Sequence, residues 1–238
     1  MKLHLTDIEK SFDDKKILKG LNFTFEKGKI YGLLGRNGAG KTTLFNIIYK
    51  ELNADKGEVS YEDEGNTRVP EIEDIGMIFA EPYLPEFLTG YEYIKFIIDI
   101  SKPHEISYID QYFDMMDFDE VDRHKLIKDY SSGMKSKTSL LALYVQQPPI
   151  ILLDEPLTAV DVLAGAEIKK FFRSLKNDHI IILSTHMLDL AKDICDEIVL
   201  LNDGFLTSLN DLEKDENYEE RIVNALREQN VWCYILKC

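Results

Sequence analysis

Apolar and polar positions along the chain predict short strands first and alternating strands and helices later. In the first sixty residues, alternation predicts strands over 2–5, 21–25 and 58–61. A different pattern lies between the second and the third. The apolar run Ile30–Leu34 leads into a glycine-rich segment, and residues 41–49 then have helical periodicity. This succession predicts a strand, a tight loop and a helix.

The middle of the chain is predominantly helical in composition. Residues 62–74 are polar and contain glycine, asparagine and proline, so we expect a turn or loop there, before a short strand over 75–79. Thr89 and Glu92 have the spacing of a capping box at the start of a helix. The composition predicts a small helical lobe, made of a helix to about Ser101, helical segments over 103–129 and a helix from about 132 to 147.

The last third alternates between apolar strands and amphipathic helices. The expected elements are strand 150–153, helix 162–176, strand 179–183, helix 188–195, strand 198–201, and a hairpin turn over 202–204 into a last short strand. Such an alternation predicts a mostly parallel sheet. Residues 211–221 hold six acids and two bases, and we expect an acidic connector there, followed by a terminal helix over about 218–229.

Composition narrows the classes of function. The chain has 238 residues, of which 45% are hydrophobic, so it can bury the core of one domain. Its formal net charge of −15 disfavours a partner made of nucleic acid, whose phosphates need cationic protein surfaces. The longest apolar run, 140–145, is far shorter than the roughly 20 residues of a membrane-spanning helix. Three unpaired cysteines and a start without an apolar signal segment favour the reducing cytosol.

Residues 35–42 match the pattern Gly-x4-Gly-Lys-[Ser/Thr] at every constrained position, between an expected strand and an expected helix. The glycines let backbone N–H groups surround phosphates, and the helix N-terminus opposes their charge. Lys41 would contact the terminal phosphates and Thr42 would ligate magnesium. The predicted nucleotide-binding residues here are Gly35, Arg36, Asn37, Gly38, Ala39, Gly40, Lys41, Thr42 and Thr43.

A second element of the site follows the apolar strand over 150–153, which ends in Asp154 and Glu155. Asp154 would hold Mg2+ through water, and Glu155 would act as the general base for the attacking water. Alone, an acidic pair after a strand fits a solvated surface equally well. Its combination with the phosphate loop favours hydrolysis of a nucleotide.

Four further features occur in a fixed order along the chain. Phe12 precedes the phosphate loop, Tyr130–Lys135 reads Tyr-Ser-Ser-Gly-Met-Lys, and Asp161 and His186 follow the acidic pair. With the two phosphate motifs, they resemble the adenine-stacking aromatic, signature segment, D-loop and switch histidine of the nucleotide-binding domains of ABC transporters. The resemblance covers residues 1 to about 210.

The resemblance implies the ABC ATPase fold, an α/β fold. Its P-loop NTPase core has a mostly parallel sheet, with an N-terminal antiparallel β subdomain and an inserted helical subdomain over about 82–147. Residues 1–210 would form the nucleotide-binding domain and residues 211–238 a short C-terminal extension.

Roles for several residues also come from the resemblance. Ser131, Ser132 and Gly133, at a helix start, would face the phosphates held by a second subunit, so that two subunits enclose two ATP molecules. His186 would contact the γ-phosphate and the water, as a catalytic residue beside Glu155 and Lys41. Asp161 would couple the two sites. ATP and Mg2+ are thus the expected cofactors, and a homodimer is the simplest assembly.

Two positions depart from the family pattern. After the strand over 75–79, where the family has glutamine, this chain has Ala80 followed by Glu81. Alanine cannot ligate magnesium, so either Glu81 replaces the glutamine or the metal keeps an extra water, which we favour. Ser132 stands where the first signature glycine does, and its side chain would slow hydrolysis or add a hydrogen bond.

The stretch containing Tyr83, Leu84 and Phe87 is apolar and is expected to be partly exposed. In the family, this region borders the groove that receives a coupling helix of the membrane subunit. The alternative is ordinary packing of the helical lobe on the core.

We therefore expect the ATP-hydrolysing subunit of a two-component transporter, peripheral to the cytoplasmic face of the membrane, that drives a separate permease. The small size of the chain beyond residue 210 favours export of a peptide, toxin or drug over import. One alternative is a cytosolic ABC ATPase of an assembly scaffold of the iron–sulfur type. Another is a binding switch that scarcely hydrolyses ATP.

Overall fold

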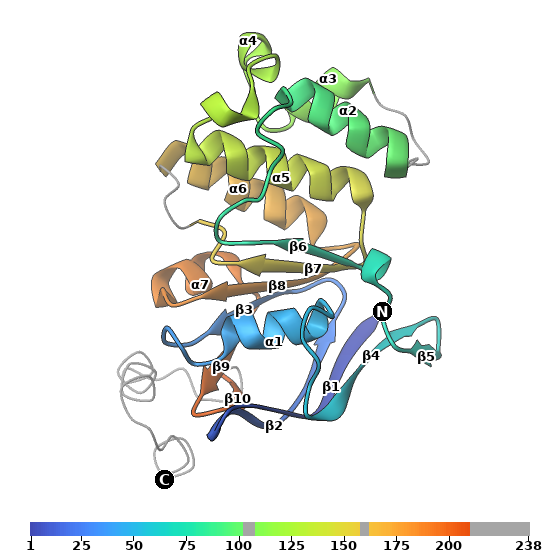
Figure 1. Ribbon diagram of the computed structural model, residues 1–238, viewed down its shortest axis with the longest axis vertical. Helices are drawn as coiled ribbons and strands as arrows, with labels where there is room; N and C mark the ends of the chain where they lie inside the picture. The colour runs from blue at the N-terminus through green and yellow to red at the C-terminus, as the bar shows by residue number, and fades with distance from the viewer. Residues whose placement is uncertain (102–107, 158–161, 210–238) are drawn as a thin grey trace.

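The computed structural model describes residues 1–101, 108–157 and 162–209, which form two sheets and a set of helices (Figure 1). The N-terminal sheet is antiparallel, in the order β2 (Lys15–Glu26), β1 (Lys2–Phe12), β4 (Lys56–Asp63) and β5 (Asn66–Arg68). The larger sheet has the order β10 (Phe205–Ser208), β9 (Glu197–Asn202), β3 (Ile30–Leu34), β8 (Ile180–Thr185), β7 (Ile150–Asp154) and β6 (Ile75–Ile78). All neighbours in the larger sheet are parallel except β10 and β9.

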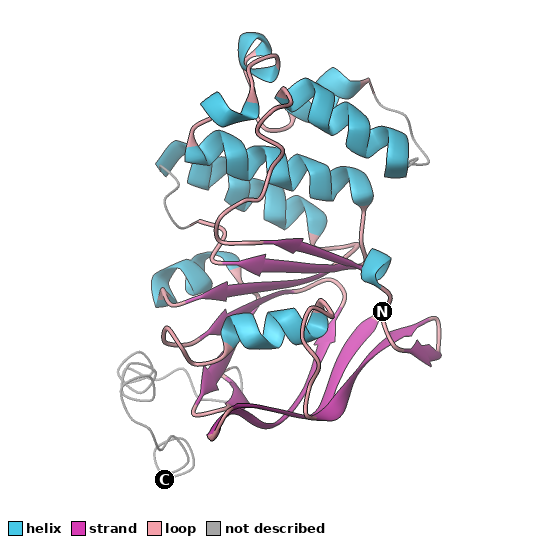
Figure 2. Cartoon of the chain, in the orientation of Figure 1, coloured by secondary structure: helices cyan, strands magenta, loops and turns pink. Residues whose placement is uncertain are grey.

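Helices cover both faces of the larger sheet (Figures 1 and 2). One face carries α1 (Lys41–Ile48), which lies between the larger sheet and the N-terminal sheet. The other face carries α5 (Ser132–Gln146), α6 (Val162–Leu175) and α7 (Leu188–Ile194). The helical lobe beyond α5 consists of α2 (Gly90–Ser101), α3 (Ile109–Asp114), α4 (Glu120–Arg123) and the 3-10 turn Ile127–Asp129.

The apolar strands of the larger sheet are buried on both faces. In β7, Ile150 and Leu152 belong to the core that contains α1, whereas Ile151 and Leu153 belong to the core that contains α5 and α6. Successive side chains of a strand point to opposite faces, so an uninterrupted apolar run is needed where both faces carry helices. Packing of helices on both faces holds the strand ends in place. The expected α/β fold with a mostly parallel sheet is confirmed.

The predicted capping box and final hairpin are both present. The backbone N–H and the hydroxyl of Thr89 each donate to Glu92 Oε2 at 2.9 Å, and the N–H of Glu92 donates to Thr89 Oγ1 at 3.1 Å. The turn at Asp203 and Gly204 joins β9 to β10. Short-range hydrogen bonds therefore define these ends, as the sequence indicated.

The turn expected over 62–74 is present, but it belongs to a hairpin that was not expected. Glu64 and Gly65 have positive φ angles of 48° and 82°, and their two-residue turn pairs Asp63 with Asn66 to begin β5. A 3-10 turn, Ile72–Asp74, follows. Because the side chains of β5 are all exposed and polar, no alternation marks it as a strand.

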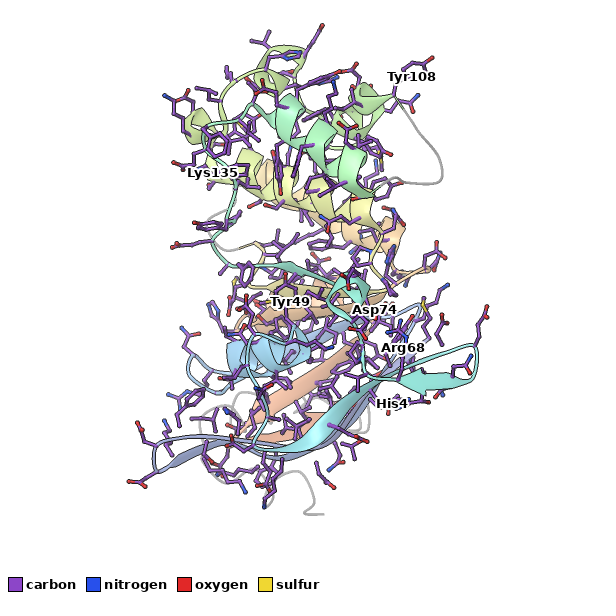
Figure 3. The ribbon with its side chains drawn as sticks, turned by 45° about the vertical axis from the view of Figure 1, so that its right-hand side comes forward. His4, Tyr49, Arg68, Asp74, Tyr108 and Lys135 are labelled. Atoms are coloured by element: carbon purple, nitrogen blue, oxygen red, sulfur yellow. The ribbon has the colours of Figure 1, made fainter. Side chains whose placement is uncertain are left out.

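The same region is held by an ion pair. Arg68 donates to both carboxylate oxygens of Asp74, at 2.5 and 2.7 Å, and the two side chains lie next to each other in Figure 3. The guanidinium of Arg68 lowers the pKa of the Asp74 carboxyl. This pair ties β5 to the turn that leads into β6.

Some expectations cannot be compared with the fold. The acidic connector over 211–221, the terminal helix over about 218–229 and Asp161 lie outside the described residues. Within the described ranges, no helix is both long and apolar enough to cross a membrane.

Candidate active site

The glycine-rich loop joins β3 to α1 at the carboxyl edge of the larger sheet. Gly40 is the N-cap of α1, with a φ of 108°, and no side chain caps the helix there. A Cβ on Gly40 would lie 2.9 Å from Cγ2 of Ile17, so a larger residue would meet both strain and a steric clash. The first-turn N–H groups of α1 have no partner within the helix and are available to an anion.

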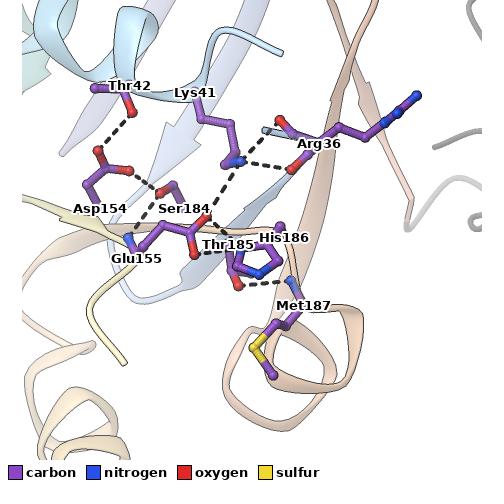
Figure 4. Close-up of polar contacts among 10 residues, drawn as sticks. Arg36, Lys41, Thr42, Asp154, Glu155, Ser184, Thr185, His186 and Met187 are labelled. Carbon is purple, nitrogen blue, oxygen red and sulfur yellow. Dashed lines mark hydrogen bonds and ion pairs between the residues drawn. The ribbon is translucent and has the colours of Figure 1, made fainter. Parts of the chain in front are cut away.

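Lys41 lies inside the loop. Its Nζ atom donates to the carbonyl oxygens of Gly35 at 2.8 Å and Arg36 at 3.3 Å, and lies 3.6 Å from Glu155 Oε1 (Figure 4). The side chain is only 7% exposed. The loop thus surrounds a single buried ammonium group, next to the free helix terminus.

Asp154, at the end of β7, faces Thr42 of α1. The Thr42 hydroxyl donates to Asp154 Oδ2 at 2.9 Å, and the Ser184 hydroxyl donates to Asp154 Oδ1 at 2.5 Å. The Asp154 side chain is buried, and both of its oxygens have partners. The carboxylate is therefore held in one orientation, with one oxygen on the phosphate-loop side (Figure 4).

Glu155 and His186 face each other across adjacent strand ends. His186 Nδ1 lies 2.9 and 2.8 Å from the two carboxylate oxygens of Glu155. Glu155 has a positive φ of 50°, and its N–H donates to the carbonyl of Ser184. The arrangement places a carboxylate between an imidazole and the ammonium of Lys41, where it can accept a proton from water.

These groups line one cavity of about 510 Å³. Phe12, at the end of β1, is 46% exposed and lines this cavity, where it could stack on a base. This exposure excludes a position in the hydrophobic core for Phe12. The lining comprises Phe12, Ile17, Asn37, Gly38, Gly40, Lys41, Thr42, Thr43, Ala80, Asp154, Glu155 and His186.

Other residues of the loop lie outside this lining. Arg36 and Ala39 line a neighbouring hollow of about 210 Å³ on the far side of the loop. A Cβ on Gly35 would lie 2.7 Å from the carbonyl oxygen of Leu201, so the loop packs closely on β9 at this glycine.

The signature segment lies apart from the cavity. Ser131 is the N-cap of α5, and its hydroxyl accepts from the N–H of Met134 at 3.2 Å. Ser131 and Ser132 are exposed, Gly133 is buried, and none of the three lines the cavity. Lys135, labelled in Figure 3, forms an ion pair of 2.9 Å with Glu86. The signature segment is therefore not part of the cavity of its own chain.

The neighbourhood of Ala80 separates two expectations. Ala80 lines the cavity, whereas the exposed Glu81 does not. This placement favours an extra water on the metal over replacement of the missing glutamine by Glu81.

The apolar stretch is exposed only in part. Tyr83 is 97% exposed and Phe87 is 79% exposed, but Leu84 is buried and packs in the core that contains α5. The expectation that Leu84 contributes to an accessible surface is wrong, because the chain turns its side chain inward between the two exposed aromatics.

Two residues at the site were not predicted from the sequence, and only the first of them lines the cavity. Ile17 lies on β2. Among the described lining residues, it is the only one with an aliphatic side chain on a strand. Ser184 contacts both catalytic-site carboxylate residues. Its place two residues before His186 was visible, but its contacts depend on which strand lies beside β8.

The oxygen ligands present fit Mg2+ better than a softer metal. A hydroxyl and a carboxylate oxygen 2.9 Å apart suit a hard cation that takes its remaining ligands from phosphates and water. In the described part of the chain, no group of three or more His, Cys, Asp or Glu residues could form an all-protein metal site. Thr42 and Asp154 are therefore the residues that would hold Mg2+ together with a nucleotide.

A glycine-rich loop, a buried lysine and two carboxylates at the end of a parallel strand define a P-loop nucleoside triphosphatase. The particular family follows from comparison with known proteins. The model of the family described as ABC transporter matches residues 18–158, and the chain belongs to this family. The chain is accordingly an ATP-binding subunit with ATPase activity.

Individual relatives agree. The chain is 31% identical over 245 residues to the ABC transporter ATP-binding protein YtrB of Bacillus subtilis (strain 168), across 96% of this chain and 81% of YtrB. It is 27% identical over 225 residues to the lantibiotic transport ATP-binding protein SrtF of Streptococcus pyogenes, across 94% of this chain and 97% of SrtF. A solved ATP binding subunit of an ABC transporter has the same fold, with a TM-score of 0.80, 22% identity, and coverage of 96% of this chain and 100% of that one.

Proposed function

We propose that two copies of this chain bind two ATP molecules between them and hydrolyse them to drive a separate membrane permease. The cargo would be a peptide, toxin or drug leaving the cell. The similarity to SrtF, a lantibiotic transport protein, supports a peptide. The chain would act at the cytoplasmic face of the membrane, where a permease could contact Tyr83 and Phe87.

In this mechanism, binding of ATP rearranges Lys41. The ammonium group exchanges the carbonyls of Gly35 and Arg36 for the terminal phosphates, and the free N–H groups of α1 donate to the same phosphates. The adenine stacks on Phe12 at the rim of the cavity. Bound Mg2+, held by Thr42 and Asp154, supplies neutralisation of the phosphate charge.

Glu155 then orients the attacking water and accepts its proton. His186 holds both carboxylate oxygens of Glu155 before ATP enters, and could turn one ring nitrogen towards the γ-phosphate afterwards. Most of the rate enhancement comes from positioning and charge stabilisation, because phosphoryl transfer needs little covalent chemistry from the protein.

The second subunit contributes the signature segment. Ser131, Ser132 and Gly133 start a helix on an exposed surface, outside the cavity of their own chain. A helix start attracts phosphate, and a head-to-tail pair would bring this one to the partner's γ-phosphate. Asp161 would couple the two sites in such a pair.

The observation that carries the proposal is the group formed by Lys41, Glu155 and His186 at one end of the cavity. Phosphate release from ATP should fall about 10²- to 10⁴-fold in Glu155→Gln, the range for loss of a general base. Glu58→Gln, an exposed change of the same kind on β4, is the matched control. Equal rates in the native chain and Glu155→Gln would reject hydrolysis at this site.

A role in transport is tested separately, by identifying the protein that co-purifies with this chain. The native complex should be recovered from detergent-solubilised membranes together with an integral membrane protein. Recovery with cytosolic proteins alone would instead indicate the assembly-scaffold alternative, which no present observation favours.

A further inference from the structure

Ser184 occupies the centre of the catalytic edge. It lies near the end of β8, directly paired with Asp154 of β7, and is fully buried. Because β8 is inserted between β3 and β7, Ser184 lies between the strand that leads into the phosphate loop and the strand that carries the two acids. The proposed mechanism of hydrolysis gives it no role.

The hydroxyl of Ser184 makes two hydrogen bonds in opposite senses. It donates its one proton to Asp154 Oδ1 at 2.5 Å, and it accepts from the N–H of Glu155 at 3.2 Å. Its donation occupies Asp154 Oδ1, so the carboxylate cannot rotate without losing that bond. The other oxygen, Oδ2, therefore stays towards Thr42.

The second bond acts on the backbone of Glu155. This residue has a φ of 50°, in the left-handed region that non-glycine residues seldom adopt. Its N–H points at both the carbonyl oxygen and the hydroxyl of Ser184. The turn held in this way directs the Glu155 side chain towards Lys41 and His186 (Figure 4).

We infer that Ser184 is a positioning residue for ATP hydrolysis, which fixes the magnesium-facing oxygen of Asp154 and the backbone turn of Glu155 through one hydroxyl. The inference rests on the proposed function. Partners that orient a metal-binding carboxylate commonly matter almost as much as the carboxylate itself.

The hydrogen-bond acceptor of the Ser184 hydroxyl distinguishes this residue from other buried hydroxyl residues. Thr138 of α5 is also fully buried, and its hydroxyl donates to the carbonyl oxygen of Met134 at 2.8 Å, within its own helix. Ser184 has instead a carboxylate from another strand as its acceptor. Thr138 therefore serves as the matched control for removal of a buried hydroxyl.

The test compares Ser184→Ala with Thr138→Val in the full chain. The first measurement is equilibrium binding of a fluorescent, non-hydrolysable ATP analogue, with EDTA and with Mg2+. In EDTA, Ser184→Ala should bind within about twofold of the native chain, because Lys41 and the helix N-terminus are unchanged. The ratio of the affinity in Mg2+ to the affinity in EDTA should be about 10- to 100-fold smaller in Ser184→Ala than in the native chain.

The second measurement is turnover. The kcat of Ser184→Ala at saturating ATP and Mg2+ should fall about 10- to 100-fold. Thr138→Val should keep both the kcat and the response to Mg2+. Thermal unfolding of each variant shows whether it is folded, and if Ser184→Ala is not, Ser184→Cys, of similar size but with a weak donor, is measured by the same criteria.

The outcomes distinguish this inference from the proposed function. A native response to Mg2+ and a native kcat in a folded Ser184→Ala, or in Ser184→Cys, overturn the positioning role. Loss of stability with both quantities unchanged assigns Ser184 to folding alone. If instead the native chain releases no phosphate, or Glu155→Gln matches it, the proposed function fails, whatever the Ser184 variants do.

Discussion

Two helix N-termini in this molecule begin in opposite ways. At α1, the N-cap is Gly40 in the left-handed region, and no side chain caps the helix. At α5, the hydroxyl of Ser131 accepts from the N–H of Met134. The start of α1 lines an open cavity and carries a buried lysine, whereas the start of α5 is exposed. The N-terminus of α1 can therefore be capped by a ligand that binds in the cavity of the same chain.

The difference separates what one chain can bind from what it can catalyse. The phosphate loop, Asp154, Glu155 and His186 are brought together by the fold of a single chain. The exposed start of α5, in contrast, does not line the cavity of its own chain. Under the proposed function, ATP binding therefore belongs to one subunit, and hydrolysis requires two.

The same contrast applies to charge. The net charge of −15 repels ATP at long range, yet the first turn of α1 has no acidic residue and begins with Lys41. At short range, the nearby ammonium and the aligned N–H groups outweigh the field of distant, solvated charges, which salt screens. Binding of the anionic nucleotide is thus a local property of the phosphate loop.

The largest expected effect is at the α1 terminus. Lys41→Ala removes the buried cation, so binding of a fluorescent ATP analogue should weaken and phosphate release should fall about 10²- to 10³-fold. Lys56→Ala, whose side chain is 73% exposed on β4, is the control and should match the native chain. If Lys41→Ala bound the analogue as tightly as the native chain, the phosphate loop would not be the nucleotide-binding site.

The next effect distinguishes the α5 terminus from the first. Ser131→Asp keeps a residue that caps helices but adds a negative charge where the partner's phosphates should lie. Phosphate release should fall about 10²-fold, while binding of ATP to the single chain stays native, since only the assembled site is affected.

Ser131→Asn is the matched control for that change, because asparagine caps equally well without charge. It should retain most of the activity lost in Ser131→Asp. If both variants lose ATP binding in the single chain, the division of labour between the two termini is wrong.

A smaller effect concerns the missing glutamine. Glu81→Gln should change the Mg2+ concentration for half-maximal hydrolysis by no more than about twofold, because this exposed carboxylate does not line the cavity. A Mg2+ titration of phosphate release measures it. A requirement raised many-fold would identify Glu81 as a metal ligand instead.

The smallest effect is at the opposite end of β8, far from either helix terminus. His179 is buried, its Nδ1 lies 2.7 Å from the carbonyl oxygen of Pro148, and burial lowers the pKa of its imidazole from the usual value of 6.5. As the pH falls below about 6.5, the unfolded chain takes up the proton first, so the free energy of unfolding should decrease.

Urea unfolding between pH 8 and pH 5.5 measures this dependence. His179→Gln should cost about 1 kcal/mol at pH 8, through the lost hydrogen bond, and should flatten the decrease at lower pH. An unchanged slope in His179→Gln would assign the pH dependence to other groups.

Local patterns in the sequence were sufficient for much of the fold. The capping box of Thr89 and Glu92, the two-sided apolar strands and the glycine-rich loop all depend on residues within a few positions of one another. The hairpin that contains β5 was missed because its polar side chains give no alternation, although Glu64 and Gly65 supply its turn. Leu84 was misplaced because composition does not show which way a chain turns between exposed neighbours.

The sequence by itself determined the phosphate loop, the acidic strand end and their order, because spacing along the chain specifies these. Only the tertiary structure decided that β8 lies between β3 and β7, which brings together Thr42, Asp154 and Ser184 from distant parts of the chain. Strand order depends on how long-range packing is satisfied, and no short pattern encodes it. For this reason the sequence indicated the chemistry, while the fold showed that the Ser184 hydroxyl contacts both the Asp154 carboxylate and the backbone N–H of Glu155.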